Sequence, residues 1–172
     1  MNTWVLSDLH FGHDNVILFC NRPTTPEEQE DWIIGRLNAH IKPGDIVYHI
    51  GDFAFGPRGK YADIVRILGK LNGNWNFIIG NHDKENQLKS ACASTRHNVL
   101  GIYHEKKLLD KTFVMFHYPI ENWNKKHYGA IHLHGHIHNG RNKLDIENRY
   151  NVCFDKNEAF VPYNMKDFYE KN

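Results

Sequence analysis

The chain has 172 residues, with 21 Lys and Arg against 20 Asp and Glu and a formal net charge of +1. This length suits one domain with one hydrophobic core, so we expect a single domain over residues 1–172. The near balance of charge argues against a chain whose main role is to coat nucleic acid or an anionic membrane.

The cysteines and the N-terminal residues indicate the cellular compartment in which the protein is expected. Cys20, Cys92 and Cys153 lie far apart, without the paired spacing of a disulfide framework. The N-terminal residues do not have the pattern of a secretory signal, and no stretch approaches the ~20 apolar residues of a membrane span. We therefore expect reduced thiols, a cytoplasmic protein and no membrane contact, whereas the sequence leaves the oligomeric state open.

The first half of the chain predicts strands that alternate with helices. The expected elements are a strand at 4–6, a helix at 25–40, a strand at 46–50 and a helix at 61–71. The first helix has the pattern of a capping box, with Thr25 as N-cap, Pro26 as the first helical residue and Glu28 as the partner of Thr25. The second helix has apolar residues at helical spacing and is followed by Gly73.

The second half of the chain predicts mostly strands. They are expected at 75–79, 112–116, 130–134 and 149–154, with a short helix at 165–169. Leu108 and Leu109 are expected to form the first arm of a hairpin. Strands that alternate with helical patterns indicate an α/β fold.

Five of the expected strands are followed directly by residues that bind metals. These residues are Asp8 and His10; Asp52; Asn81, His82 and Asp83; His117; and His136 and His138. Open α/β sheets bind ligands at the carboxyl ends of their strands, because side chains converge there. Carboxylate, imidazole and amide groups together favour Mn, Fe, Co, Ni or Zn over Ca and Mg.

Each of these short motifs alone has a plainer origin. An isolated Asp-x-His is mostly chance, Gly-Asp is more often a turn, and His-x-His is more often a half-buried strand face. Their occurrence in order, each at the end of a strand, favours a common site. Gly51, Gly80 and Gly135 precede three of the motifs and would let the backbone come close to an ion.

The ordered motifs resemble those of the calcineurin-like metallophosphoesterase family. The pattern reads Asp-x-His, Gly-Asp, Gly-Asn-His-Asp, His and Gly-His-x-His from Asp8 to His138, and looks most like small phosphoesterases of bacteria and their viruses. The resemblance implies a four-layered α/β/β/α sandwich and two divalent ions per chain, with Mn²⁺ expected and Fe, Ni, Co or Zn as alternatives. Carried over to this sequence, one ion would be held by Asp8, His10 and His138, the other by Asn81, His117 and His136, with Asp52 bridging.

The resemblance also implies a mechanism. A metal-bridging hydroxide would attack the phosphorus of a small phosphoester directly. His82 would be the general acid, and Asp83 would orient its imidazole. His13 and Arg22 are candidates for binding substrate. The alternatives are that His13 contacts a metal-bound water and that Arg22, which precedes Pro23, belongs to a simple turn.

The substrate class rests on charge. Two divalent ions bring four positive charges, and Asp8, Asp52 and the hydroxide remove three, so a phosphodiester monoanion balances the remainder. The Asp-Arg-Gly continuation of protein phosphatases is absent after Gly51-Asp52. We therefore expect a phosphodiesterase acting on a nucleotide-like or other small phosphoester. A phosphomonoesterase, a nuclease without a basic surface, and a metal-binding interaction scaffold are the alternatives.

Overall fold

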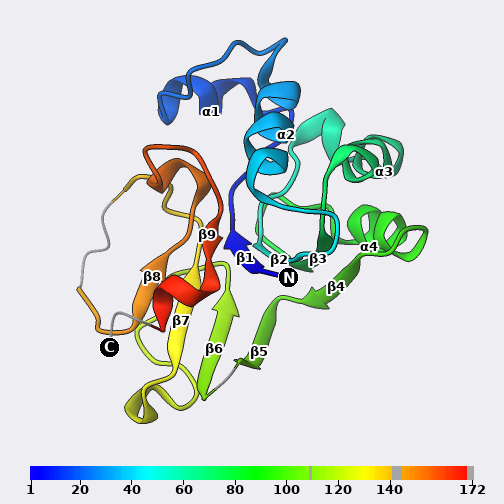
Figure 1. The fold of residues 1–172 in the computed structure, drawn as a ribbon. Coiled ribbons are helices and arrows are strands. Elements are labelled where there is room, and N and C mark those ends of the chain that lie inside the picture. Colours follow the sequence, from blue (N-terminus) through cyan, green and yellow to red (C-terminus); the bar gives the residue numbers. More distant parts are fainter. Residues whose placement is uncertain (109, 141–144, 170–172) are drawn as a thin grey trace.

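The computed structural model describes residues 1–108, 110–140 and 145–169, which form two β-sheets (Figure 1). The first sheet has the order β4-β3-β2-β1-β9, and its strands are β1 (Thr3–Leu6), β2 (Ile46–Ile50), β3 (Asn74–Ile78), β4 (Asn98–Gly101) and β9 (Tyr163–Asn164). The second has the order β5-β6-β7-β8, with β5 (Tyr103–Leu108), β6 (Lys111–Phe116), β7 (Ile131–His134) and β8 (Arg149–Asn151). Neighbouring strands from β1 to β4 and from β6 to β8 run parallel, so their carboxyl ends meet at one edge of each sheet.

Helices pack against one face of the first sheet (Figure 1). They are α2 (Gln29–His40), α3 (Tyr61–Lys70) and α4 (Glu85–Ala93), with the 3₁₀ turn η1 (Gly56–Gly59) before α3. The short helix α1 (Asp14–Phe19) follows β1 and lies beyond the carboxyl end of that strand (Figure 1). Leu37, Ile67 and Leu88 come from successive helices and belong to one buried cluster with Val47 and Trp75 of the sheet. This cluster is the helical side of the core.

The other face of the first sheet packs against the second sheet. Val5, Tyr48 and Ile78 of the first sheet form a second buried cluster with Phe113 and Leu133 of the second sheet. Successive side chains of a strand point to opposite faces, so Val47 joins the helical core while its neighbour Tyr48 joins this one. The predicted α/β fold with two stacked sheets is confirmed.

Among the described residues, the outer face of the second sheet is covered by a loop rather than by helices. Val114 of β6 packs with Trp123 and Ala130, which lie in the loop after β6. This loop contains the 3₁₀ turn η2 (Lys126–Tyr128), and in the described part of the chain it takes the place of an outer α-helix. No described helix is long and apolar enough to cross a membrane.

Most predicted elements are present, and the differences have local causes. The capping box is wrong, because α2 begins at Gln29 and its cap residue Glu28 makes no side-chain capping bond. The buried side chain of Gln29 instead accepts from Gly12 N (3.0 Å) and donates to His13 O (3.2 Å), which ties the helix start to the loop after β1.

The C-terminal elements are shorter than predicted. The strand expected to reach residue 154 ends at Asn151, and the 3₁₀ turn η3 (Phe154–Lys156) follows it. The final helix is the 3₁₀ turn η4 (Met165–Phe168). Leu108 does end a strand that pairs antiparallel with β6, whereas Leu109 lies outside the described residues.

Candidate metal centre

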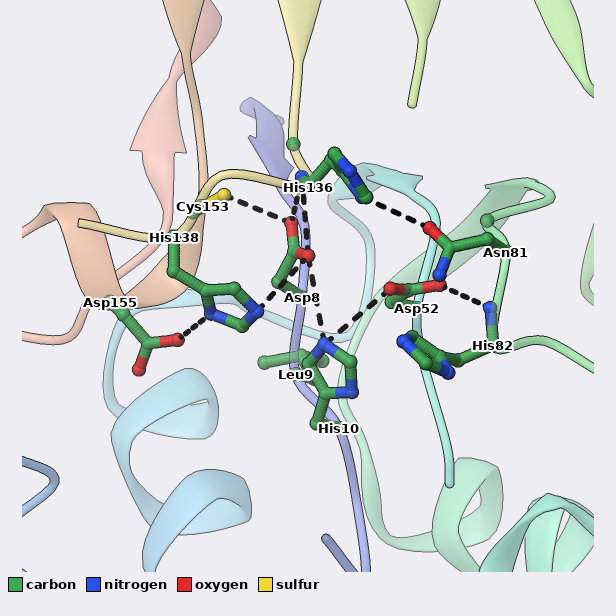
Figure 2. Close-up of polar contacts among 12 residues, drawn as sticks. Asp8, Leu9, His10, Asp52, Asn81, His82, His136, His138, Cys153 and Asp155 are labelled. Atoms are coloured by element: carbon green, nitrogen blue, oxygen red, sulfur yellow. Dashed lines mark hydrogen bonds and ion pairs between the residues drawn. The ribbon is translucent and has the colours of Figure 1, made fainter. Parts of the chain in front are cut away.

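The residues expected to bind metal come together where strands of both sheets end (Figure 2). The segments after β1, β2 and β3 of the first sheet meet those after β6 and β7 of the second. The side chains divide into a group around Asp8 and a group around Asp52.

The first group consists of Asp8, His10 and His138. Their ligand atoms lie within 4.8 Å of one another. Asp8 Oδ1 is 3.6 Å from His10 Nε2 and 3.7 Å from His138 Nε2. Since Asp8 and His10 are buried, a divalent cation between these side chains would be largely shielded from water.

The second group lies around Asp52 and His117. Asp52 Oδ2 is 3.3 Å from His117 Nε2, and Asn81 Oδ1 lies 3.0 Å from the same nitrogen and 3.1 Å from His136 Nδ1. Asp52 Oδ2 is also 3.5 Å from His10 Nε2 of the first group. One carboxylate therefore lies between the two groups.

The ring nitrogens of these histidines fit a metal. His10 is buried, yet neither of its ring nitrogens has a hydrogen-bond partner among the described residues. Such an arrangement is costly unless another group satisfies it. His117 Nδ1 lies 2.8 Å from Ile50 O, which can only accept, so Nδ1 carries the proton and Nε2 keeps its lone pair for the site. Imidazole, carboxylate and amide together suit a divalent transition ion.

The backbone around the site is strained. Five of the side chains come from non-glycine residues with left-handed backbone, namely Asp8 (φ 60°), His10 (φ 51°), Asp52 (φ 61°), His136 (φ 71°) and His138 (φ 48°). This conformation costs on the order of 1 kcal/mol or more per residue, and such strain concentrates at functional sites. Glycines permit the close packing: a Cβ on Gly80 would lie 2.3 Å from Asp52 Oδ1, and one on Gly135 would lie 2.3 Å from Asp8 Oδ2.

Both carboxylates remain ionised in this environment. Burial alone would raise the pKa of Asp8, but the contact with His10 and the charges of His117 and His138 outweigh it and hold the pKa below its usual value. Asp52 follows the same pattern. Burial alone would raise its pKa, but the contact with His117 and the charges of His117 and His10 outweigh burial, so the pKa lies below its usual value. The two groups thus supply negative charge to a cation.

The family is shown by comparison with known proteins. Residues 1–153 match the calcineurin-like phosphoesterase superfamily domain. The chain belongs to this superfamily. It is 34% identical over 143 residues to an uncharacterised protein of Methanocaldococcus jannaschii, which covers 83% of this chain and 71% of the relative.

Solved structures show the same fold. A protein of unknown function from Aquifex aeolicus, AQ665, superposes with a TM-score of 0.74 at 22% identity over 98% of both chains. A novel archaeal phosphodiesterase superposes with a TM-score of 0.51 at 18% identity, over 89% of this chain and 82% of the other. At these identities the likeness concerns the fold alone.

Within this calcineurin-like domain, Asp83 does not have the predicted role. Its Oδ2 accepts from Asp52 N (2.8 Å) and Gly80 N (2.9 Å), and its Oδ1 accepts from Phe53 N (2.8 Å). The prediction that Asp83 orients the His82 imidazole is wrong, because these amides occupy its carboxylate. Asp83 instead holds together the loops that carry Asp52 and Asn81.

Arg22 does not bind substrate either. Its side chain is fully buried and its guanidinium pairs with Asp155, with distances of 2.6 Å from Nε to Oδ1 and 2.9 Å from Nη2 to Oδ2. The guanidinium also donates to Leu9 O and Asp8 O. The prediction of a substrate contact is wrong, because these internal acceptors take the N–H groups that would bind a phosphate.

His13 and His82 lie beside the first group of metal-ligand candidates. Their rings are 5.4 Å and 5.5 Å from the ring of His10, centroid to centroid. Phe55 lies between them, 4.1 Å from the ring of His13 and 5.2 Å from that of His82. His82 is exposed, and its backbone N–H donates to Asp52 Oδ1 (2.8 Å), which fixes its position relative to the metal-ligand candidates.

Sequence reasoning missed a second layer of side chains. The Cys153 thiol donates to Asp8 Oδ2 (3.0 Å), and Asp155 Oδ2 is 2.7 Å from His138 Nδ1 (Figure 2). Both residues follow β8, so the rule of strand ends could have found them. Cys153 was hidden because it lay inside the strand predicted at 149–154, whereas Asp155 directly follows that predicted strand and was overlooked.

Proposed function

We propose that this chain is a phosphoester hydrolase that uses two divalent cations, with Mn²⁺ the expected ion, and that it acts on phosphodiesters. The observation that supports two ions is the position of Asp52, whose Oδ2 lies 3.5 Å from His10 Nε2 and 3.3 Å from His117 Nε2. A carboxylate between two groups of nitrogen and oxygen ligands suits a bridge.

Each ion would have its own ligands. Asp8, His10 and His138 would hold one, and Asn81, His117 and His136 the other. When bound, the two cations would act as Lewis acids toward the phosphate and activate a water as the nucleophile. His117 is prepared for this role, because Ile50 O holds the proton on its Nδ1.

His82 would protonate the leaving oxygen. It is exposed at the mouth of the site, where a substrate can reach it, and its backbone is anchored to Asp52. A general acid contributes about 10²–10⁴-fold to the rate, most where the leaving group is a poor one. His13, on the other side of Phe55, would contact the substrate rather than transfer a proton.

The ion pairs of two arginines near the site support a diester substrate over a monoester. A monoester dianion needs one more positive charge at the site than a diester monoanion. Arg22 is committed to Asp155, and Arg58 pairs with Asp63 (Nη1–Oδ1 2.9 Å) and lies 4.0 Å from Glu30. Both arginines that could have supplied that charge are thus paired with carboxylates of this chain, which leaves a protonated His82 as the remaining source.

The test compares two substrates with the same nucleoside. Full-length protein loaded with Mn²⁺ is assayed with a linear or cyclic nucleotide diester and with the corresponding nucleoside monophosphate. A higher kcat/KM for the diester is expected, and a higher value for the monophosphate would overturn the diester preference. Protein that holds two ions but hydrolyses neither class, nor a nucleic-acid end, would instead be an interaction scaffold.

A further inference from the structure

A buried ion pair lies behind one group of metal-ligand candidates. The side chains of Arg22 and Asp155 are both fully buried and meet through two bonds, Nε to Oδ1 at 2.6 Å and Nη2 to Oδ2 at 2.9 Å. Buried pairs of this kind are a weak source of stability, because removing two charges from water costs about as much as their attraction returns. The contacts of the pair suggest another role.

Asp155 acts on His138. Its Oδ2 lies 2.7 Å from His138 Nδ1 (Figure 2). An ionised carboxylate can only accept, so the proton of the neutral ring is on Nδ1 and the lone pair is on Nε2. His138 Nε2 is the atom that lies 3.7 Å from Asp8 Oδ1 in the first group. Carboxylates that fix the tautomer and orientation of a ligating histidine in this way strengthen metal binding.

Arg22 acts on the backbone that carries the other two members of the same group. Its Nη1 donates to Leu9 O (2.7 Å) and its Nη2 to Asp8 O (2.8 Å). These carbonyls belong to the turn in which Asp8 and His10 have left-handed backbone. One guanidinium therefore stabilises the strained turn that presents two ligand candidates and holds the carboxylate that orients the third.

A metal held by Asp155 itself is the plainer alternative. Cys20 Sγ lies 3.4 Å from His138 Nδ1, and Cys20, His138 and Asp155 have ligand atoms within 4.8 Å of one another. Arg22, however, contacts both oxygens of Asp155. A divalent cation bound there would lie beside a guanidinium in a buried environment, where repulsion between like charges is strong.

We propose that Arg22 and Asp155 are a positioning unit that sets the geometry of Asp8, His10 and His138 for one of the two metal ions. This inference rests on the proposed metal centre. The unit touches neither substrate nor the reacting atoms, and it acts on one ion, since the other group of side chains lies around Asp52 and His117.

The main test replaces Asp155→Asn in the full-length protein. The amide oxygen can take the place of Oδ2 and accept from His138 Nδ1 and Arg22 Nη2, but it is a weaker, neutral acceptor, and the amide NH₂ then faces Arg22 Nε, which loses its acceptor. Titration of metal-free protein with Mn²⁺ should show about 10–100-fold weaker binding of one ion and unchanged binding of the other. NMR of Zn²⁺-loaded protein gives a second readout: the His138 Nδ1 proton should exchange slowly in the wild type and rapidly in the variant.

Two further variants separate a positioning role from the general effect of removing a buried charge. Arg22→Lys keeps the charge but loses the planar fork and the carbonyl contacts, so it should weaken the same ion even if Asp155→Asn does not fold. Asp45→Asn is the matched control. Asp45 is also buried and accepts from Asn2 N, Trp4 Nε1 and Lys42 N, but it lies at the start of β2, away from the strand ends of the site.

The outcomes distinguish this inference from the proposed function. Selective loss of one ion in Asp155→Asn and Arg22→Lys, with both ions retained in Asp45→Asn, supports the positioning unit. Equal losses in Asp155→Asn and Asp45→Asn, or unchanged binding in the former, would overturn it while leaving the proposed metal centre intact. A loss in Cys20→Ser as large as in Asp155→Asn would overturn it in favour of a Cys20 site. A wild-type protein that binds no divalent ion would overturn both proposals.

Discussion

Asp83→Asn tests whether the carboxylate of Asp83 holds the loops of the site together. In the native protein it accepts from Asp52 N, Gly80 N and Phe53 N at 2.8–2.9 Å. The amide oxygen of Asn can take the place of Oδ2 and keep the first two bonds. The amide NH₂ then faces Phe53 N–H, and Phe53 is fully buried.

The expected loss follows from these contacts. Leaving a buried N–H unsatisfied costs about 1–3 kcal/mol, and changing two bonds from charged to neutral acceptors costs on the order of 1 kcal/mol each. Burial raises the pKa of Asp83, which indicates that its negative charge is poorly solvated. Replacing this charge by a neutral amide therefore offsets part of the lost stability. Together these effects predict that the free energy of unfolding falls by about 3 kcal/mol.

Urea denaturation of the metal-free protein measures this loss. The rate with Mn²⁺ should also fall, and by the same factor for esters with good and poor leaving groups, because the loops that carry Asp52 and Asn81 are displaced. A variant that loses less than about 0.5 kcal/mol, the range of neutral surface changes, would contradict the structural role. A rate loss confined to poor leaving groups would instead place Asp83 on the proton path of His82.

Three further predictions concern catalysis, metal binding and pH. His82→Ala should retain both ions and lose about 10²–10⁴-fold in rate with a poor leaving group but much less with nitrophenolate; equal losses for both would exclude a general acid. Asp52→Asn should weaken binding of both ions, measured by titration, and a loss of rate without any loss of binding would argue against a bridging carboxylate. Burial lowers the pKa of His97 to about 4, and its Nδ1 accepts from Trp75 N, so the folded protein resists a proton that the unfolded chain takes up. The free energy of unfolding should therefore decrease as the pH falls from about 6.5 to about 4, and His97→Gln should show a smaller decrease; an unchanged decrease would exclude His97 as a source.

The positions of the metal-ligand candidates could be read from the sequence because they depend on local order. Each follows a strand whose apolar residues are recognisable, and parallel strands bring their ends to one edge. The stacking of two sheets did not follow from the pattern and came from the family resemblance. The elements that were missed have weak signals: α4 buries only Leu88, Ala91 and Cys92, and α1 leaves Leu18 and Phe19 exposed.

The roles of Arg22 and Asp83 were wrong for a different reason. Both were assigned from residue type and neighbours in sequence, but their partners are set by tertiary structure. Arg22 meets Asp155, which lies 133 residues away, and Asp83 meets Asp52 and Phe53 on the preceding loop. A polar side chain near an active site can serve the substrate or the scaffold, and only the positions of its acceptors and donors distinguish the two.

The central claim is that two ions lie on either side of Asp52. The most direct measurement reconstitutes the full-length protein with excess Mn²⁺ and locates the metal in a crystal by anomalous scattering, with elemental analysis for the stoichiometry. Two peaks are expected, one beside Asp8, His10 and His138 and one beside Asn81, His117 and His136, with Asp52 in contact with both. A single peak at full loading, or metal away from Asp52, would contradict the claim.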